Sequence, residues 1–340
     1  MPNNSIKILF LMTLISGVLI SVCANSWLGA WMGLEINLLS FIPLLSSNQN
    51  MLSTEASLKY FLVQAIASSS LLFLILVKIN MCEMFYLSNS IWNNMIIIPL
   101  LMKIACAPFH WWLPMIVEGL SWMNCFLIFS IQKITPLMLI SYMISNNFFI
   151  QTMIILSTLM GAIGGFNQIS LRKILSFSSI NHIGWMLTTM IMGLNLWFMY
   201  FIAYTINIIS IISLTNMTKL SYISQTFNIM NNKKMIKFIL FICLLSLGGL
   251  PPFLGFFPKW ITIQFMIQNF MMVTSTILIM SSLLTLFYYM RIMYTTLMIS
   301  NFEIIWTTSI KPKHNFKVLM FSLSVSLLGM LICSLTTLSY

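Results

Sequence analysis

Long apolar stretches with almost no charge dominate this sequence. Only 6% of its 340 residues are charged, and 59% are hydrophobic, whereas a soluble domain carries about 25% charged residues. So few charges cannot cover a water-facing surface. Stretches of about 20 apolar residues are long enough to cross a bilayer as helices. The sequence therefore predicts an all-α integral membrane protein.

About eleven stretches are long and apolar enough to be membrane spans. They cover residues 5–23, 26–46, 57–77, 92–116, 121–143, 149–166, 173–192, 196–218, 237–271, 273–291 and 316–338. The fourth and ninth contain proline and, in the ninth case, glycine within the apolar run, which predicts helices broken at about 104–108 and 248–253. Together the spans form one polytopic membrane domain over residues 1–340.

The basic residues outside the spans fall almost entirely on one side of the predicted bundle. The side that holds the N-terminus carries twelve of them: Lys7, Lys59, Arg172, Lys173, Lys219, Lys233, Lys234, Lys237, Arg291, Lys311, Lys313 and Lys317. The other side carries Lys78 alone. Because basic loops stay on the cytoplasmic or matrix side, we expect the N-terminus there and the C-terminus opposite. The net charge of +11 thus indicates membrane topology and not a nucleic-acid partner.

A short pattern recurs in the two interrupted spans. The fourth reads APFHWWLP at 107–114 and the ninth reads PPFLGFFP at 251–258, and both contain P-F-x-x-x-x-P. The two copies lie an odd number of spans apart, so they cross the membrane in opposite senses. Paired broken helices of this kind are typical of inverted repeats around a transport site. The residues that form the breaks are Pro108, Gly248, Gly249, Pro251 and Pro252.

Four ionisable side chains lie inside predicted spans, namely Glu35, Lys103, Lys133 and Lys259. Each buried lysine costs about 2.5–3.5 kcal/mol on insertion scales, so a function or a pairing has to retain it. Glu35 can pair with only one lysine, and Lys103 is its best candidate. Desolvation without a counter-ion favours a neutral amine, which suits proton exchange. We therefore expect a proton relay in a hydrated pocket beside the breaks.

Structural roles without transport are also open to these residues. Lys103 and Lys259 could instead extend to the membrane surface, and Glu35 could serve only a polar helix contact. His182, in the polar stretch SFSSINHIGW, and His110 are further candidates for the relay or for its hydration; the alternative is that each is a hydrogen-bonded core histidine. The six cysteines form no C-x-x-C pair. No metal or cofactor site is expected in this chain.

Five segments together resemble one protein family. They are WMGLEINLLSFIPLL, KIACAPFHWWLP, IQKITP, SLRKILSFSSINHIGWM and SLGGLPPFLGFFPKW. The sequence resembles the subunit 2 family of animal mitochondrial NADH dehydrogenase, the small antiporter-like subunit of respiratory complex I, over about residues 5–295. Its Ile, Met, Asn and Phe-rich composition without aspartate is similar to that of insect mitochondrial proteins.

The resemblance implies an eleven-helix bundle with inverted five-helix repeats at 5–143 and 149–291, followed by a last helix at 316–338. It implies that the relay consists of Glu35, Lys103, Lys133 and Lys259, with His182 at a polar position between them. Two departures stand out. Ala105 occupies a position where the family carries glycine, and I-Q-K-I-T-P replaces W-Q-K-x-A-P.

The function that the resemblance implies is proton translocation by a membrane-arm subunit of complex I in the mitochondrial inner membrane. NADH, FMN, iron–sulfur clusters and ubiquinone would bind partner subunits, and this chain would carry no redox centre. Its partners would be other membrane-arm subunits and lipids such as cardiolipin. Two alternatives remain open at this point: a stand-alone cation/proton antiporter, and a structural scaffold of the membrane arm without transport.

Overall fold

The computed structural model describes residues 3–46, 50–81, 89–230 and 234–298, together with residues 321, 323, 324, 326 and 327. Every regular element in these residues is a helix, and an isolated bridge joins Ser170 to Tyr222. The chain forms two compact units, Met1–Ser157 and Thr158–Tyr340. The predicted last span at 316–338 lies almost wholly outside the described residues.

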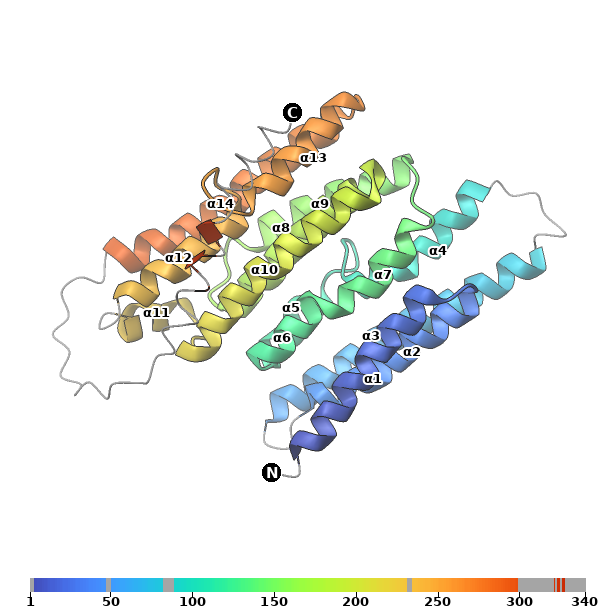
Figure 1. The fold of residues 1–340 in the computed structure, drawn as a ribbon, viewed down its shortest axis with the longest axis horizontal. Helices are drawn as coiled ribbons and strands as arrows, with labels where there is room; N and C mark the ends of the chain where they lie inside the picture. The colour runs from blue at the N-terminus through green and yellow to red at the C-terminus, as the bar shows by residue number, and fades with distance from the viewer. Residues whose placement is uncertain are drawn as a thin grey trace. The chain divides into compact units, whose positions relative to one another are not determined.

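The first unit contains seven helices and most of an eighth (Figure 1). They are α1 (Asn3–Cys23), α2 (Trp27–Leu45), α3 (Met51–Met81), α4 (Asn89–Ile104), α5 (Trp112–Gly119), α6 (Trp122–Phe129), α7 (Ile131–Ser141) and α8 (Phe148–Gly164), which continues into the second unit. Helices α1 and α2 pack closely through glycines. A Cβ on Gly33 would lie 2.6 Å from the backbone nitrogen of Ser21, and one on Gly17 would lie 2.9 Å from that of Asn37. Small residues permit such close helix contacts in membranes.

Up to residue 298, the described part of the second unit contains the end of α8 and six further helices (Figure 1). They are α9 (Leu171–Met192), α10 (Leu194–Thr218), α11 (Ile223–Met230), α12 (Lys234–Gly248), α13 (Phe256–Gln268) and α14 (Met272–Met298). Helix α9 packs on α10, α13 and α14, and α10 also packs on α12 and α13. Every residue of α9 from Ile174 to Met190 is buried, so α9 is the central helix of this unit.

The predicted spans between residues 5 and 291 each coincide with a helix or with a pair of helices. Within the described residues, six helical segments are long and apolar enough to cross a membrane, which agrees with the all-α membrane class. Two features were not predicted. The span at 121–143 is interrupted at Ser130, between α6 and α7, and the short helix α11 lies in a region that was expected to be a loop.

The first helix break begins with a Schellman motif at the end of α4. The N–H of Cys106 donates to the carbonyl of Leu101 at 3.0 Å, and the N–H of Ala105 donates to that of Met102 at 3.2 Å. This pattern requires a left-handed residue after the helix, and Ala105 has φ +66°. The glycine that the family resemblance implies here is therefore the residue that the backbone favours. An alanine in this conformation costs about 1–2 kcal/mol.

The second break begins with the same motif at the end of α12. The N–H of Leu250 donates to the carbonyl of Leu245 at 3.4 Å, and the N–H of Gly249 donates to that of Ser246 at 3.2 Å. Here the left-handed residue is Gly249, with φ +83°. Ala105 and Gly249 thus hold the same place in the two copies, and Pro108 and Pro252 each follow three residues later.

The observed breaks are longer than predicted: α5 resumes at Trp112 and α13 at Phe256. Each compact unit contains one of them. The boundary between the units falls within α8, after Ser157, whereas the predicted repeats meet between 143 and 149. The inverted relation of the two repeats stays a prediction.

Gly255 provides a test of the second break. A Cβ at this position would lie 1.8 Å from the carbonyl oxygen of Ser246, whereas one on Gly248 would meet its nearest atom at 3.5 Å. Because the clash involves backbone that cannot move aside, Gly255→Ala should destabilise the assembled protein by about 3 kcal/mol or more. Thermal melting of the purified protein measures this. Gly248→Ala is the matched control, and equal melting temperatures for the two variants would contradict the described packing.

Candidate functional site

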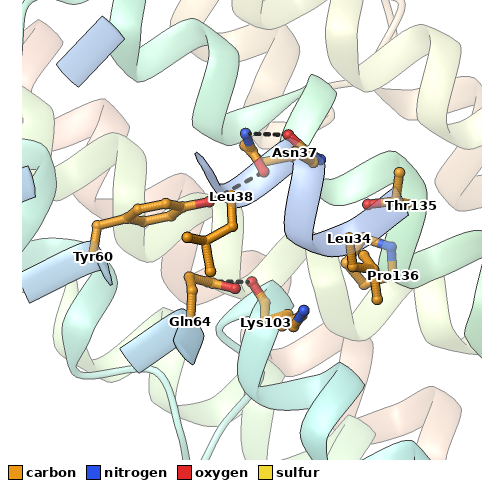
Figure 2. Close-up of a pocket in the computed structure, with 9 residues that line it drawn as sticks. Leu34, Asn37, Leu38, Tyr60, Gln64, Lys103, Thr135 and Pro136 are labelled. Carbon is orange, nitrogen blue, oxygen red and sulfur yellow. Dashed lines mark hydrogen bonds between the residues drawn. The ribbon is translucent and has the colours of Figure 1, made fainter. Parts of the chain in front are cut away.

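Lys103 lies in the last turn of α4, beside the first break, and only 6% of its surface is exposed. It lines a small pocket with room for about one water molecule. The other lining residues come from α2, α3 and α7: Leu34, Asn37, Leu38, Tyr60, Gln64, Gln132, Thr135 and Pro136 (Figure 2). The buried lysine therefore lines a pocket together with five neutral polar side chains: Asn37, Tyr60, Gln64, Gln132 and Thr135.

A chain of hydrogen bonds crosses this pocket and joins three helices. The hydroxyl of Tyr60 donates to Gln132 Oε1 at 3.2 Å, and Gln132 Nε2 donates to Asn37 Oδ1 at 2.9 Å. The bonds connect α3 to α7 and α7 to α2. Amides that are hydrogen-bonded on both sides fix the rotation of the helices that carry them, so this network sets how α7 presents Lys133, the residue after Gln132.

Backbone carbonyls at the end of α4 are satisfied by neutral side-chain donors. Gln64 Nε2 donates to the carbonyl of Lys103 at 3.3 Å, a bond drawn in Figure 2. Trp112 Nε1 donates to the carbonyl of Met102 at 3.1 Å. A helix end leaves carbonyls without intrahelical partners, and an apolar environment makes such groups costly. Gln64 and Trp112 thus allow α4 to end inside the bundle.

The pocket also contains a polar atom that needs a partner. Thr135 Oγ1 is buried and has no hydrogen-bond partner among the described residues. Thr135 and Lys103 line the same pocket. Buried polar groups without a protein partner are commonly satisfied by ordered water. The pocket is therefore suited to a water molecule within reach of both the lysine and the threonine.

Glu35 is half-buried on α2 and does not line this pocket. Its carboxylate acts on the Lys103 amine electrostatically. Among the described residues, however, the one ion pair within 4.0 Å is that between Lys59 and Glu55 on the surface of α3. Glu35 and Lys103 thus interact through space and not through a direct ion pair, which leaves the strength of their coupling sensitive to what lies between them.

Lys133 is 2% exposed and lies between two interruptions of its span. Ser130 separates α6 from α7, and its hydroxyl donates to the carbonyl of Phe126 at 2.7 Å. Pro136, inside α7, has no N–H to donate to the carbonyl of Gln132. The carbonyl of Gln132 therefore lacks the N–H donor that a residue other than proline would supply at position 136. The burial excludes an extension of this lysine to the membrane surface.

Lys259 lies in the first turn of α13 and turns back to the end of α12. Its amine donates to the carbonyl of Gly248 at 2.9 Å and to that of Leu247 at 3.3 Å. The Nζ atom also lies 5.9 Å from the centre of the Trp185 ring. The C-terminal end of a helix carries a partial negative charge, and the ring face attracts cations. These groups stabilise an ammonium where no carboxylate is available.

The two candidate histidines have different surroundings. His182, on α9, places Nδ1 2.8 Å from the hydroxyl of Tyr200, and its ring centre lies 5.0 Å from that of Tyr204. His110 lies within the first break, with Nδ1 3.3 Å from the carbonyl of Pro108. His182 is thus part of an aromatic polar cluster between α9 and α10, whereas the Nδ1 contact of His110 stays within its own loop.

The candidate residues divide between the two units. The first unit holds Lys103 and Lys133, with Glu35 at the edge of the group, and the second holds His182 and Lys259. In the second unit, Asn181 Oδ1 and Trp185 Nε1 are buried without a hydrogen-bond partner among the described residues. These atoms flank His182 on α9 and favour water there as well.

Sequence reasoning missed the neutral polar residues of the pocket: Asn37, Tyr60, Gln64, Gln132 and Thr135. A signal existed for two of them, since Gln132 and Thr135 belong to the segment IQKITP. Single amides within apolar runs give no further indication of whether they face the interior. Their role depends on the contacts of neighbouring helices.

Known proteins are similar to this chain over most of its length. The family described as NADH:quinone oxidoreductase/Mrp antiporter, TM, matches residues 24–285. Proteins named NADH-ubiquinone oxidoreductase chain 2 are 47% identical in Aedes aegypti, over 98% of each chain, and 42% identical in Locusta migratoria, over 98% of this chain and 97% of the relative.

Solved structures share the fold. A chain of respiratory complex I from Thermus thermophilus with bound aureothin superimposes with a TM-score of 0.83 at 18% identity, over 96% of this chain and 78% of its own. A chain of the Mrp complex from Dietzia sp. DQ12-45-1b gives 0.75 at 18% identity, over 88% of this chain and 61% of its own.

The amide network around Lys103 predicts energetic coupling between two helices. Gln132→Leu should leave Asn37 Oδ1 unpaired, and Asn37→Leu should do the same to Gln132, so each should cost about 1–3 kcal/mol. The double variant should cost less than the sum, because replacing both partners leaves no orphaned amide. Thermal melting of the assembled complex completes the cycle. Additive losses would show that the two side chains do not interact.

Proposed function

The chain belongs to the NADH-ubiquinone oxidoreductase chain 2 family, and we propose from this membership that it is an antiporter-like, proton-translocating subunit of the membrane arm of respiratory complex I. It is a multi-pass protein of the mitochondrial inner membrane, with the N-terminus in the matrix. Oxidation of NADH and reduction of ubiquinone take place in partner subunits, and this chain carries no redox centre.

The observation that supports proton translocation most strongly is the burial of three lysines beside helix interruptions. Lys103, Lys133 and Lys259 are exposed by 6%, 2% and 5%. At about 2.5–3.5 kcal/mol each, they have a combined cost comparable to the net stability of a domain. Groups that gain and release a proton inside a membrane are the usual reason for retaining such residues.

The proposed path runs from Glu35 to Lys103, then Lys133, then water near His182, and finally Lys259. A charge that arrives from a neighbouring subunit changes the electrostatic action of Glu35 on Lys103. When the carboxylate no longer favours the ammonium, Lys103 releases its proton to the adjoining polar pocket. The proton then passes through water toward Lys133 and the second unit. Each step moves one proton and requires no redox chemistry in this chain.

Independent cation/proton exchange is a second candidate function, because the fold is shared with the Mrp complex. Sodium-dependent proton flux through the isolated chain in proteoliposomes would favour it. A scaffold that binds lipid headgroups through its lysines is disfavoured by the burial of Lys103 and Lys133. Cardiolipin and other lipids remain expected partners at the outer surface.

Lysine substitution tests the relay directly. Lys133→Ala and Lys259→Ala should each lower NADH-driven proton pumping several-fold in the reconstituted complex, because each removes a proton-carrying group from the path. The amount of assembled complex on native gels should persist, which separates transport from folding. Lys133→Arg and Lys259→Arg keep the charge but release a proton far less readily, so they should also pump poorly. Full pumping by either alanine variant would refute the relay.

Glu35 provides an independent prediction. Glu35→Gln removes the charge that acts on Lys103 but retains the shape and polarity of the side chain. The variant should pump less than the wild type and should show an altered dependence of pumping on pH. Proton uptake by vesicles at a series of pH values measures both. An unchanged pH profile would exclude the coupling between Glu35 and Lys103.

A further inference from the structure

The two helix breaks share a backbone motif but satisfy it with different donors. In the first, the carbonyl of Lys103 accepts a hydrogen bond from the neutral amide of Gln64. In the second, the carbonyl at the same place of the motif, that of Leu247, accepts one from the amine of Lys259. One position in the fold thus carries a neutral donor in one unit and a titratable donor in the other. The second break, unlike the first, therefore depends on a donor that can gain or lose a proton.

No acidic side chain is available to Lys259 among the described residues of the second unit, since residues 158–298 contain neither Asp nor Glu. Helix α13 packs on α9, α10 and α14, and its lysine bonds α12. The buried titratable side chains on these elements are His182, Tyr200, Tyr204, Lys237, Cys243, Tyr288 and Tyr289. None of these is anionic in its ordinary state near neutral pH. Within the described residues of this unit, the carbonyl end of α12 carries the partial negative charge that the amine contacts.

Gly249 lies against this amine. A Cβ at position 249 would stand 3.0 Å from both Cδ and Nζ of Lys259. The left-handed φ alone does not require glycine, because Ala105 occupies the equivalent place in the first break with φ +66°. The feature that sets position 249 apart from position 105 is its contact with the Lys259 amine. Since the clash involves the far end of a flexible side chain, a methyl group at 249 would displace the amine more readily than the backbone.

We propose that the carbonyls of Leu247 and Gly248 are the counter-charge of the Lys259 ammonium, and that Gly249 is the positioning residue that lets the amine reach them. The proposal rests on the proposed role of Lys259 in proton transfer. For Lys259, the carbonyl end of α12 then serves the electrostatic role that the Glu35 carboxylate serves for Lys103. The proposal also means that each proton gained or lost by Lys259 changes the strength of the hydrogen bonds between its amine and the end of α12.

Gly249→Ala tests the proposal in the reconstituted complex. The carbonyls stabilise the protonated amine, so moving the amine away from them weakens proton binding. The pH above which NADH-driven pumping declines should therefore move to lower values by about one unit, while NADH oxidation and assembly persist. A wild-type pH profile, or a loss of pumping that is equal at every pH, would overturn the proposal.

A stability cycle separates the amine from the backbone. If the methyl group acts by displacing the amine, Gly249→Ala should lower the melting temperature of the complex in the wild type and much less in a Lys259→Ala background, where the longer side chain is absent. An equal decrease in both backgrounds would overturn the proposal, because the left-handed backbone would then account for the whole effect.

The two hypotheses fail differently. Normal pumping by Lys259→Ala refutes the relay itself. Defective pumping by Lys259→Ala together with an unshifted pH profile in Gly249→Ala leaves the relay intact and refutes only the role assigned to the α12 carbonyls and Gly249.

Discussion

The structure depends on the need to satisfy backbone carbonyls where helices end inside an apolar bundle. Each such group costs several kcal/mol when it lacks a donor in hydrocarbon. Here the donors are Gln64 and Trp112 at the first break and Lys259 at the second. The breaks and the buried polar side chains therefore depend on each other. The side chains supply donors to the carbonyls, and the carbonyls supply polar partners to the side chains. The same arrangement gives a membrane domain places where charge and water are tolerated.

The two units use this arrangement in different ways. In the first, the neutral donors Gln64 and Trp112 satisfy the carbonyls of the break, and Lys103 lines a small pocket that Glu35 does not line. In the second, the amine itself holds the break. If Lys259 carries a proton as proposed, its protonation would act on the helix end that it caps, whereas Lys103 would respond to a charge outside its helix. Under the proposed relay, the first unit would receive the electrostatic signal at Lys103, and both units would carry the proton.

Much of this could be predicted from the sequence because proline, glycine and charge are conspicuous in apolar runs. The spans between residues 5 and 291, both breaks and the burial of Lys103, Lys133 and Lys259 followed from that contrast. The interruption at Ser130 could not be predicted, because serine is compatible with a helix and no glycine marks the site. The network of Asn37, Tyr60 and Gln132 was missed since isolated amides do not reveal which helix they face. Lys259 was expected to lack a counter-charge because only acidic side chains were considered as partners, whereas its amine bonds backbone carbonyls.

The most direct test of the central claim is a density map of the assembled complex at a resolution that shows ordered water. We predict water beside Lys103 and Thr135, the Lys259 amine on the carbonyls of Leu247 and Gly248, and a continuous polar file that connects Lys133 with the second unit. A dry interior, with the lysine amines turned outward to lipid and separated by packed apolar side chains, would contradict the proton relay.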